Sequence, residues 1–210
     1  MQTSDPNGNA AVSIDGYLQL NHERAVKICE KSPIYQIEHF LTDEECDKLI
    51  ELGRDKVVES TFLGPKNSHH IRDSSSYYAY DAVWLSDKVF ELTGKTRREQ
   101  EAPQICRYRK GEQYTAHYDY FHAGTGTGDS AISNGGQRIG TVLIYLNTCE
   151  DGGHTSFPTL NVSVKPTKGS ALIFFPCKFD GEVDKETLHA ALPAVNEKWV
   201  SQVWIRQFIR

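Results

Sequence analysis

Two stretches in the first half of the chain place their apolar residues at helical spacing. In residues 41–57 the apolar positions fall mostly on one stripe, as expected for a helix that packs on a core. Thr42 lies near the start of this stretch and Glu45 follows three residues later, which is the pattern of a capping box. The spacing therefore predicts a helix that begins after Thr42, and a second helix over residues 82–95.

From about residue 103 the pattern changes to short runs of β-branched and aromatic residues bounded by Gly, Pro and Asn. The clearest runs are residues 104–109, 138–147, 170–176 and 198–208. No helical run separates them, which favours antiparallel strands in a sandwich or barrel over alternating strands and helices. We therefore predict an α+β fold in which helices come first and an all-β core follows.

Residues 120–138, "YFHAGTGTGDSAISNGGQR", show neither period and include five glycines. A glycine-rich loop of this length in a compact domain is typical of a disordered segment or a mobile lid. Because it directly follows residues that could bind a metal, we expect a lid.

The composition supports one globular domain and excludes several classes of protein. The chain has 210 residues, 39% of them hydrophobic, so we expect a tail and lead-in over residues 1–32, partly disordered, and one domain over residues 33–210. The net charge of −5 argues against a nucleic-acid surface, and no run approaches the roughly 18 apolar residues of a membrane span. Five scattered cysteines without a C-x-x-C pair, and a polar N-terminus without a secretory pattern, favour reduced thiols and a cytoplasmic location.

A possible metal site lies in "YTAHYDYF", where His117 and Asp119 are two residues apart. If this segment is extended, both side chains project from one face and can bind one metal ion. The nearest template is the two-histidine, one-carboxylate site of non-haem iron oxygenases, which keeps positions open for reactants. The pair alone is a weak signal, because a histidine and an aspartate also meet in ordinary hydrogen bonds near turns. A distant strand has to supply the third ligand, and "ETLHAALP" offers His189.

Nine residues after this histidine, Lys198 begins an alternating strand and shares one face with Val200, Gln202 and Trp204. A lysine that points into a core is costly unless an anion pairs with it. A dicarboxylate bound in the pocket would provide that anion.

Six blocks in order then resemble one family: "RYRKGEQYTAHYDYF", "GGQRIGTVLIYLN", "GGHTSFP", "VKPTKGSALIFF", "LHAALP" and "KWVSQVWIR". Together with "IRDSSSYY" and the helical lead-in, residues 33–208 resemble the prolyl 4-hydroxylase branch of the 2-oxoglutarate- and Fe(II)-dependent dioxygenases. The resemblance implies a double-stranded β-helix (jelly-roll) core of antiparallel strands with N-terminal supporting helices. It also implies Fe(II), 2-oxoglutarate, O2 and ascorbate as cofactors.

The resemblance assigns roles to individual residues. His117, Asp119 and His189 match the catalytic iron ligands, and Lys198 matches the lysine that pairs with the far carboxylate of 2-oxoglutarate. The hydroxyl groups that face the cosubstrate match Tyr108 and Thr155. In this family, oxidative decarboxylation of 2-oxoglutarate to succinate is coupled to hydroxylation of a substrate C–H bond.

Further matches concern a proline-containing peptide or protein as the substrate. The residues that match its contacts are Arg72, Ser74, Glu101, Tyr114 and Trp199, and the "HAGTGTG" loop matches the lid. The chain departs from the family at His154, where glutamate is usual; we interpret it as an outer or surface histidine, with an extra metal ligand as the alternative.

Two other functions remain open at this stage. The same chemistry could act on another residue or on a small molecule, or the chain could be a zinc-binding or cupin-like module without turnover. The pattern specifies neither the oligomeric state nor the peptide.

Overall fold

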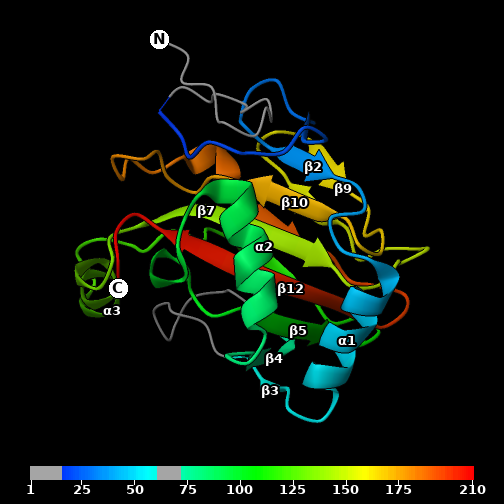
Figure 1. Ribbon diagram of the computed structural model, residues 1–210. Helices are drawn as coiled ribbons and strands as arrows, with labels where there is room; N and C mark the ends of the chain where they lie inside the picture. The colour runs from blue at the N-terminus through cyan, green and yellow to red at the C-terminus, as the bar shows by residue number, and fades with distance from the viewer. Residues whose placement is uncertain (1–15, 61–71) are drawn as a thin grey trace.

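The computed structural model describes residues 16–60 and 72–210, and its strands form two antiparallel sheets (Figure 1). The strands of the larger sheet are β1 (Val26–Lys27), β2 (Tyr35–Ile37), β3 (Val58–Glu59), β4 (Ser75–Tyr78), β5 (Gln104–Tyr108), β7 (Arg138–Tyr145), β10 (Ala171–Phe174) and β12 (Lys198–Arg206). Their order across the sheet is β1-β2-β10-β7-β12-β5-β4-β3. The strands of the smaller sheet are β6 (Tyr114–His117), β8 (Thr155–Phe157), β9 (Val162–Val164) and β11 (His189–Ala191), in the order β6-β11-β8-β9.

Helices α1 (Asp43–Arg54) and α2 (Val83–Thr93) cover one face of the larger sheet (Figure 1). The predicted capping box is confirmed, because Glu45 N donates to Thr42 Oγ1 at 3.2 Å and Thr42 N donates to Glu45 Oε2 at 2.9 Å. A Cβ atom on Gly53 would lie 2.8 Å from Ile105 Cγ2, so this glycine lets α1 approach β5 closely. The other helical elements of the described residues are α3 (Gly126–Ser133) and two short 3-10 turns, η1 (Arg97–Glu99) and η2 (Lys185–Thr187).

The alternation along β12 separates two cores. Trp199, Val203 and Ile205 pack against the helices, whereas Lys198, Val200 and Gln202 face the smaller sheet. Residues of β5, β7 and β10 alternate in the same way, so the larger sheet has an apolar face on each side. The space between the two sheets is where the candidate site lies.

The predicted order of helices first and strands later is wrong in one respect. Strand β2 pairs with β10, and β4 pairs with β5, so segments from before residue 103 extend both sides of the sheet. These early strands have two to four residues each, which is too short to show a period of two in the sequence.

The segment predicted as a glycine-rich loop also contains regular structure. Helix α3 (Gly126–Ser133) begins after Thr125, whose Oγ1 accepts a hydrogen bond from Gly128 N at 3.1 Å. The glycines lower helix propensity and give no apolar stripe, so the sequence pattern predicted no helix there. The cap and distant contacts described below hold the helix in place.

Part of the predicted lead-in packs on the domain. Leu18 and Leu20 are buried in the core between the helices and the larger sheet, and β1 pairs with β2. The first 15 residues of the predicted tail lie outside the described residues.

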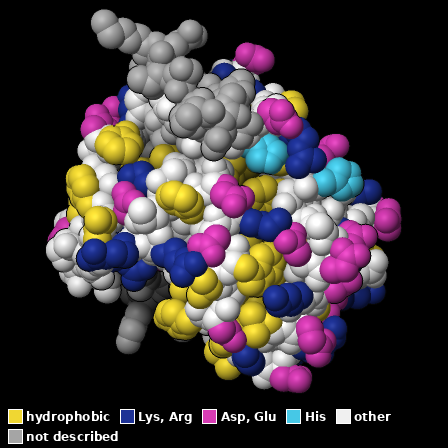
Figure 2. All heavy atoms as spheres, in the orientation of Figure 1, with side chains coloured by type: hydrophobic (Ala, Val, Ile, Leu, Met, Phe, Trp, Pro, Cys, Tyr) yellow, Lys and Arg dark blue, Asp and Glu magenta, His cyan; other side chains and the backbone are white. Residues whose placement is uncertain are grey.

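The cysteines, the helices and the surface of the described residues show no further special feature of the fold. All five cysteines are buried and free. In residues 16–60 and 72–210, every helix is too short or too polar to cross a bilayer. On the face shown in Figure 2, acidic and basic side chains are interspersed with exposed apolar ones.

Candidate active site

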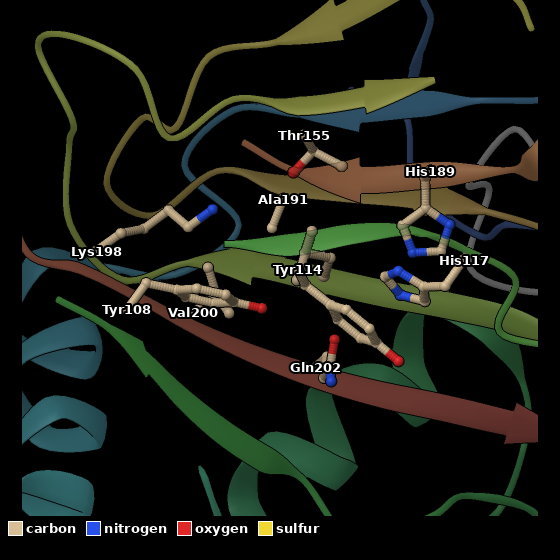
Figure 3. Close-up of a pocket in the computed structure, with 10 residues that line it drawn as sticks. Tyr108, Tyr114, His117, Thr155, His189, Ala191, Lys198, Val200 and Gln202 are labelled. Atoms are coloured by element: carbon tan, nitrogen blue, oxygen red, sulfur yellow. The ribbon is translucent and has the colours of Figure 1, made fainter. Parts of the chain in front are cut away.

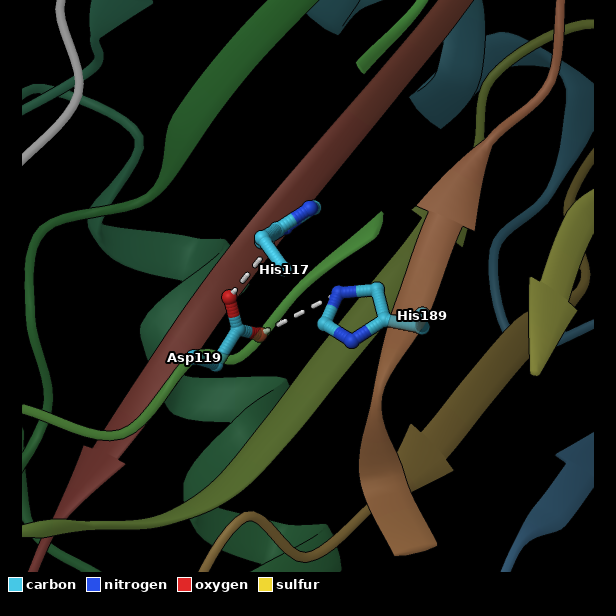
Figure 4. A group of neighbouring side chains, drawn as sticks. All are labelled: His117, Asp119 and His189. Atoms are coloured by element: carbon cyan, nitrogen blue, oxygen red, sulfur yellow. Dashed lines mark ion pairs between the residues drawn. The ribbon is translucent and has the colours of Figure 1, made fainter. Parts of the chain in front are cut away.

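Three potential metal ligands converge between the two sheets. One ligand atom from each of His117, Asp119 and His189 lies within 4.8 Å of the other two. His117 ends β6 and His189 begins β11, and the two residues pair directly in the antiparallel register. Asp119 follows in a bend rather than in the strand, as Figure 4 shows, and its carboxylate lies between the two imidazole rings. Among the described residues this is the one such group of side chains.

Backbone carbonyls orient both imidazole rings. The Nδ1 atom of His117 lies 2.8 Å from Thr115 O, and the Nδ1 atom of His189 lies 2.9 Å from Thr187 O. Because a carbonyl only accepts, each Nδ1 carries the proton, and each Nε2 presents a lone pair. Both Nε2 atoms lie 3.8 Å from an oxygen of Asp119, which is too long for a hydrogen bond. This arrangement suits three ligands around one ion.

The electrostatics keep His117 and Asp119 in their metal-binding protonation states. Burial, followed by the neighbouring His189, lowers the pKa of His117, so its ring is neutral near pH 7. Burial raises the pKa of Asp119, but the adjacent histidines and Arg138 outweigh burial and lower it. The Asp119 carboxylate is also fixed by Thr141, whose hydroxyl donates to Oδ2 at 2.8 Å. Two neutral imidazoles and one carboxylate form the donor set that non-haem iron requires, so the residues present fit that metal.

A pocket extends from these ligands to Lys198 (Figure 3). It holds about 350 Å³ of space, part of it open to solvent. Among the described residues, the lining is formed by Tyr108, Tyr114, His117, Leu143, Thr155, His189, Ala191, Lys198, Val200 and Gln202. The histidines lie at one end of the pocket in Figure 3 and the lysine lies at the other.

Lys198 is a buried cation without an acidic partner. Its side chain is 1% exposed, and its Nζ donates to Gly153 O at 2.8 Å. No carboxylate lies within 4 Å of Nζ in the part of the chain that the structure describes. Burial lowers the pKa of Lys198 to about 8, so the amine remains mostly protonated at neutral pH. An anion in the pocket would relieve this unfavourable burial.

A threonine hydroxyl and a tyrosine ring lie near the lysine in the pocket. Thr155 is 3% exposed, and its Oγ1 accepts a hydrogen bond from Tyr145 OH at 2.8 Å. Because Tyr145 supplies that proton, the Thr155 hydroxyl proton remains available for an acceptor in the pocket. The ring of Tyr108 lies 4.5 Å from Lys198 Nζ, and burial raises the pKa of the phenol, which keeps it a neutral donor.

Three of the five residues predicted to contact substrate gather near the metal ligands. Tyr114 stacks on the His117 ring with 3.5 Å between ring centroids, and the Arg72 guanidinium lies 5.0 Å from the Tyr114 ring. Arg72 Nε donates to Ser74 Oγ at 3.1 Å, and Ser74 is fully buried. Tyr114 therefore lines the metal end of the pocket, while Arg72 lies against the Tyr114 ring and is oriented by Ser74.

The other two residues predicted to contact substrate lie elsewhere. Glu101 is 9% exposed and forms ion pairs with Arg138 and Arg206. Trp199 lies on the opposite face of β12 from Lys198, in the core beneath the helices. Neither residue lines the pocket. Their assignment to substrate binding stays a prediction that this geometry does not favour. His154 is likewise absent from the pocket lining and from the described group of potential metal ligands.

Sequence reasoning did not assign roles to Thr141 or Tyr145, although both contact site residues. They lie on the same face of β7 as Leu143, in a strand whose other residues after Arg138 carry no polar side chain. A hydroxyl-bearing side chain at inward positions of such a strand is a signal that could have identified them.

Comparisons with known proteins show the family of the chain. Residues 103–206 match the model of the 2OG-Fe(II) oxygenase superfamily. The chain is 31% identical to prolyl 4-hydroxylase 2 of Arabidopsis thaliana, over 89% of this chain and 71% of the relative. Prolyl 4-hydroxylase 5 of the same plant is 33% identical, over 88% of this chain and 72% of the relative.

A solved structure extends the likeness to the fold. The viral collagen prolyl hydroxylase of Paramecium Bursaria Chlorella virus-1, in its 2OG complex, superposes with a TM-score of 0.62 and 28% identity. The match covers 85% of this chain and 98% of the viral one. The predicted α+β fold with a double-stranded β-helix core is confirmed. The family uses Fe(II), 2-oxoglutarate and O2. The chain belongs to the prolyl 4-hydroxylase family of 2-oxoglutarate- and Fe(II)-dependent oxygenases.

Proposed function

We propose that this protein hydroxylates proline residues of peptides and couples this reaction to decarboxylation of 2-oxoglutarate to succinate. The observation that carries the proposal is one pocket with a three-ligand metal site at one end and an unpaired buried lysine at the other. A structural zinc site would be completed by a fourth protein ligand, which the described residues do not supply. A structural zinc site would also leave the burial of Lys198 unexplained.

The metal end of the pocket is prepared for iron by the chain itself. His117 and His189 would bind through Nε2, because their Nδ1 atoms are occupied by backbone carbonyls. Asp119 would bind through its carboxylate, whose Oδ2 is held by Thr141. Bound iron would supply the redox chemistry that uses O2 and 2-oxoglutarate to hydroxylate a C–H bond.

The other end of the pocket would hold the far carboxylate of 2-oxoglutarate. Lys198 provides the charge, and the hydroxyls of Thr155 and Tyr108 provide oriented donors. Leu143, Val200 and Ala191 form apolar walls that reduce the water content of the pocket between the two ends.

The substrate class follows from the relatives and from the surroundings of the metal end. Relatives at 31% and 33% identity are named prolyl 4-hydroxylases. Next to His117, Tyr114 offers an apolar ring and Arg72 offers a cation, which suit a proline ring and a peptide carbonyl. We include ascorbate as the reductant that sustains turnover.

Mass spectrometry of peptides tests the proposal. Protein loaded with Fe(II) is incubated with 2-oxoglutarate, ascorbate and air, together with proline-rich peptides and matched peptides in which alanine replaces proline. We expect a gain of one oxygen atom on proline only, with equivalent succinate, and neither product with His117→Ala. Equal oxygenation of the alanine peptides, or succinate formation without any modified peptide, would contradict the proline assignment.

A further inference from the structure

Three buried charged side chains meet beside residues 117–119, the metal-binding segment that carries His117 and Asp119. Arg138 binds both carboxylate oxygens of Glu101 at 2.7 Å each, and Arg206 NH1 lies 3.4 Å from Glu101 Oε1. The three side chains are only 4–12% exposed. A bidentate pair of this kind fixes the guanidinium plane, and it leaves Glu101 little capacity to bind another molecule.

Arg138 connects this cluster to a metal ligand. Its NH1 donates to the main-chain oxygen of Asp119 at 3.3 Å. The guanidinium also lies 3.7 Å from the Trp204 ring and 4.7 Å from the Phe121 ring, two residues beyond Asp119. Asp119 lies in a bend, where strand pairing does not set its backbone. The contact from Arg138 therefore supplies a constraint that the sheet does not.

Arg206 connects the same cluster to helix α3. Its NH2 donates to the main-chain oxygens of Ala131, Asn134 and Gly136 at 2.6, 2.8 and 2.6 Å. These carbonyls lie at the C-terminal end of the helix, where unsatisfied acceptors and the helix dipole favour a cation. Arg138 contacts the metal-binding segment, and Arg206 contacts the end of α3. Because both arginines pair with Glu101, the positions of both segments depend on that pairing.

We propose that Arg138, fixed by Glu101, is a positioning residue that holds the backbone of Asp119 in its metal-binding conformation, and that Arg206 ties α3 to the same anchor. This inference rests on the proposed metal site. It gives Glu101 a role different from the substrate contact that the family resemblance implies.

Arginine is required for this role because it serves three acceptor atoms at once. Its planar fork binds two carboxylate oxygens while a third nitrogen reaches a carbonyl. A lysine at position 138 would keep the charge beside Glu101, but one ammonium group cannot reproduce this fork.

The test measures the affinity for Mn(II), used in place of Fe(II), by calorimetry under nitrogen on the full chain. The variants are Glu101→Gln and the charge-conserving Arg138→Lys, which retains a cation beside Glu101 and is expected to fold. The matched control is Glu99→Gln, because Glu99 forms a similarly buried ion pair with Lys95 and contacts no site residue.

We expect the Kd for Mn(II) to rise at least about tenfold in both test variants, the range found for groups that orient metal ligands. Hydrogen exchange should also quicken in residues 126–136. The control should be less stable than the parent while retaining its Kd and its exchange in α3. Folded test variants that bind Mn(II) within about twofold of the parent would overturn the inference. Failure of the parent itself to bind Mn(II) would refute the proposed metal site, and the inference with it.

Discussion

Two sets of buried cations border the site, and they are satisfied in opposite ways. Arg138 and Arg206 share Glu101, stack on aromatic rings and donate to backbone carbonyls. Lys198 is more deeply buried and also lies against a ring, that of Tyr108, yet it has one carbonyl as its hydrogen-bond partner and no acidic group within 4 Å among the described residues. Both arrangements place positive charge inside the protein, but only the two arginines have an acidic partner, Glu101, among the described residues.

The difference distinguishes charges that stabilise the fold, those of Arg138 and Arg206, from the charge of Lys198, which a bound anion would neutralise. A buried ion pair loses stability when one partner is removed, because the other charge remains without compensation. A buried lysine without an acid lowers stability until an anion binds. Mutations at the two places should therefore change stability in opposite directions, and only one should change the affinity for 2-oxoglutarate.

The largest expected effect on stability comes from Glu101→Gln. Two arginines that are nearly inaccessible to solvent would lose their shared charge partner, which costs about 3 kcal/mol or more in the free energy of unfolding. Denaturant unfolding of the metal-free protein measures this loss. The exposed ion pair between Lys165 and Glu150 provides the contrast, since Glu150→Gln should cost less than about 0.5 kcal/mol. Equal losses in the two variants would show that the buried cluster is not a special anchor.

The next effect comes from Lys198→Met, which should weaken 2-oxoglutarate binding about 100-fold, because a charge-assisted hydrogen bond to the carboxylate contributes up to about 3 kcal/mol. The same variant should stabilise the ligand-free protein by about 2 kcal/mol, because the cost of a buried amine is removed. Since the folded pKa lies below the unfolded value, this gain is full below pH 8 and disappears as the pH approaches 10.4. Calorimetry at pH 7 measures the affinity for 2-oxoglutarate, and denaturant unfolding at pH 7 measures the stability. A Lys198→Met variant that is less stable than the parent and binds 2-oxoglutarate equally well would contradict both predictions.

The affinity for 2-oxoglutarate should also depend on pH through Lys198. The pocket lysine has a pKa of about 8 before ligand binds, so the protonated fraction falls about tenfold for each pH unit above that value. The Kd for 2-oxoglutarate should therefore be flat below pH 8 and rise up to about tenfold per unit above it. Titrations of Mn(II)-loaded protein between pH 7 and 9 measure the slope. If the Kd of Lys198→Met rose with pH at the same rate, the pH dependence would come from a group other than Lys198.

The smallest effect is expected from Tyr145→Phe. Loss of the hydroxyl removes the donor to Thr155 Oγ1, which frees Thr155 to rotate and should raise the Kd for 2-oxoglutarate about fivefold, or about 1 kcal/mol. Tyr17→Phe is the control, since Tyr17 donates to Asp184 at 3.1 Å and lies outside the pocket lining. That control should lose stability without a change in affinity. Equal affinities of Tyr145→Phe and Tyr17→Phe for 2-oxoglutarate would show that Tyr145 does not contribute to binding through Thr155.

The sequence predicted those parts of the molecule that depend on local pattern. The capping box at Thr42 and the alternation that places Lys198 inward are local, and both could be read from neighbouring residues. Family motifs predicted the grouping of His117, Asp119 and His189, which lie up to 72 positions apart in the chain and share one site in the structure.

The remainder depends on pairing between distant segments. Helix α3 has glycines where a helix favours other residues, and it is held by Arg206, about 70 positions away. Glu101 pairs with Arg138 and Arg206, at separations of 37 and 105 residues. No local period reports such contacts, which is why the α3 segment was predicted to be a loop. The substrate contact predicted for Glu101 came from the family resemblance alone.

The most direct test of the account is an anaerobic titration of Fe(II)-loaded protein with 2-oxoglutarate, followed by visible absorbance. The account predicts a saturable band for the parent protein, saturation at about 100-fold higher concentration for Lys198→Met, and no band for His117→Ala. Absence of an iron-dependent band in the parent, or identical saturation in parent and Lys198→Met, would contradict a pocket that joins metal ligands to an unpaired lysine.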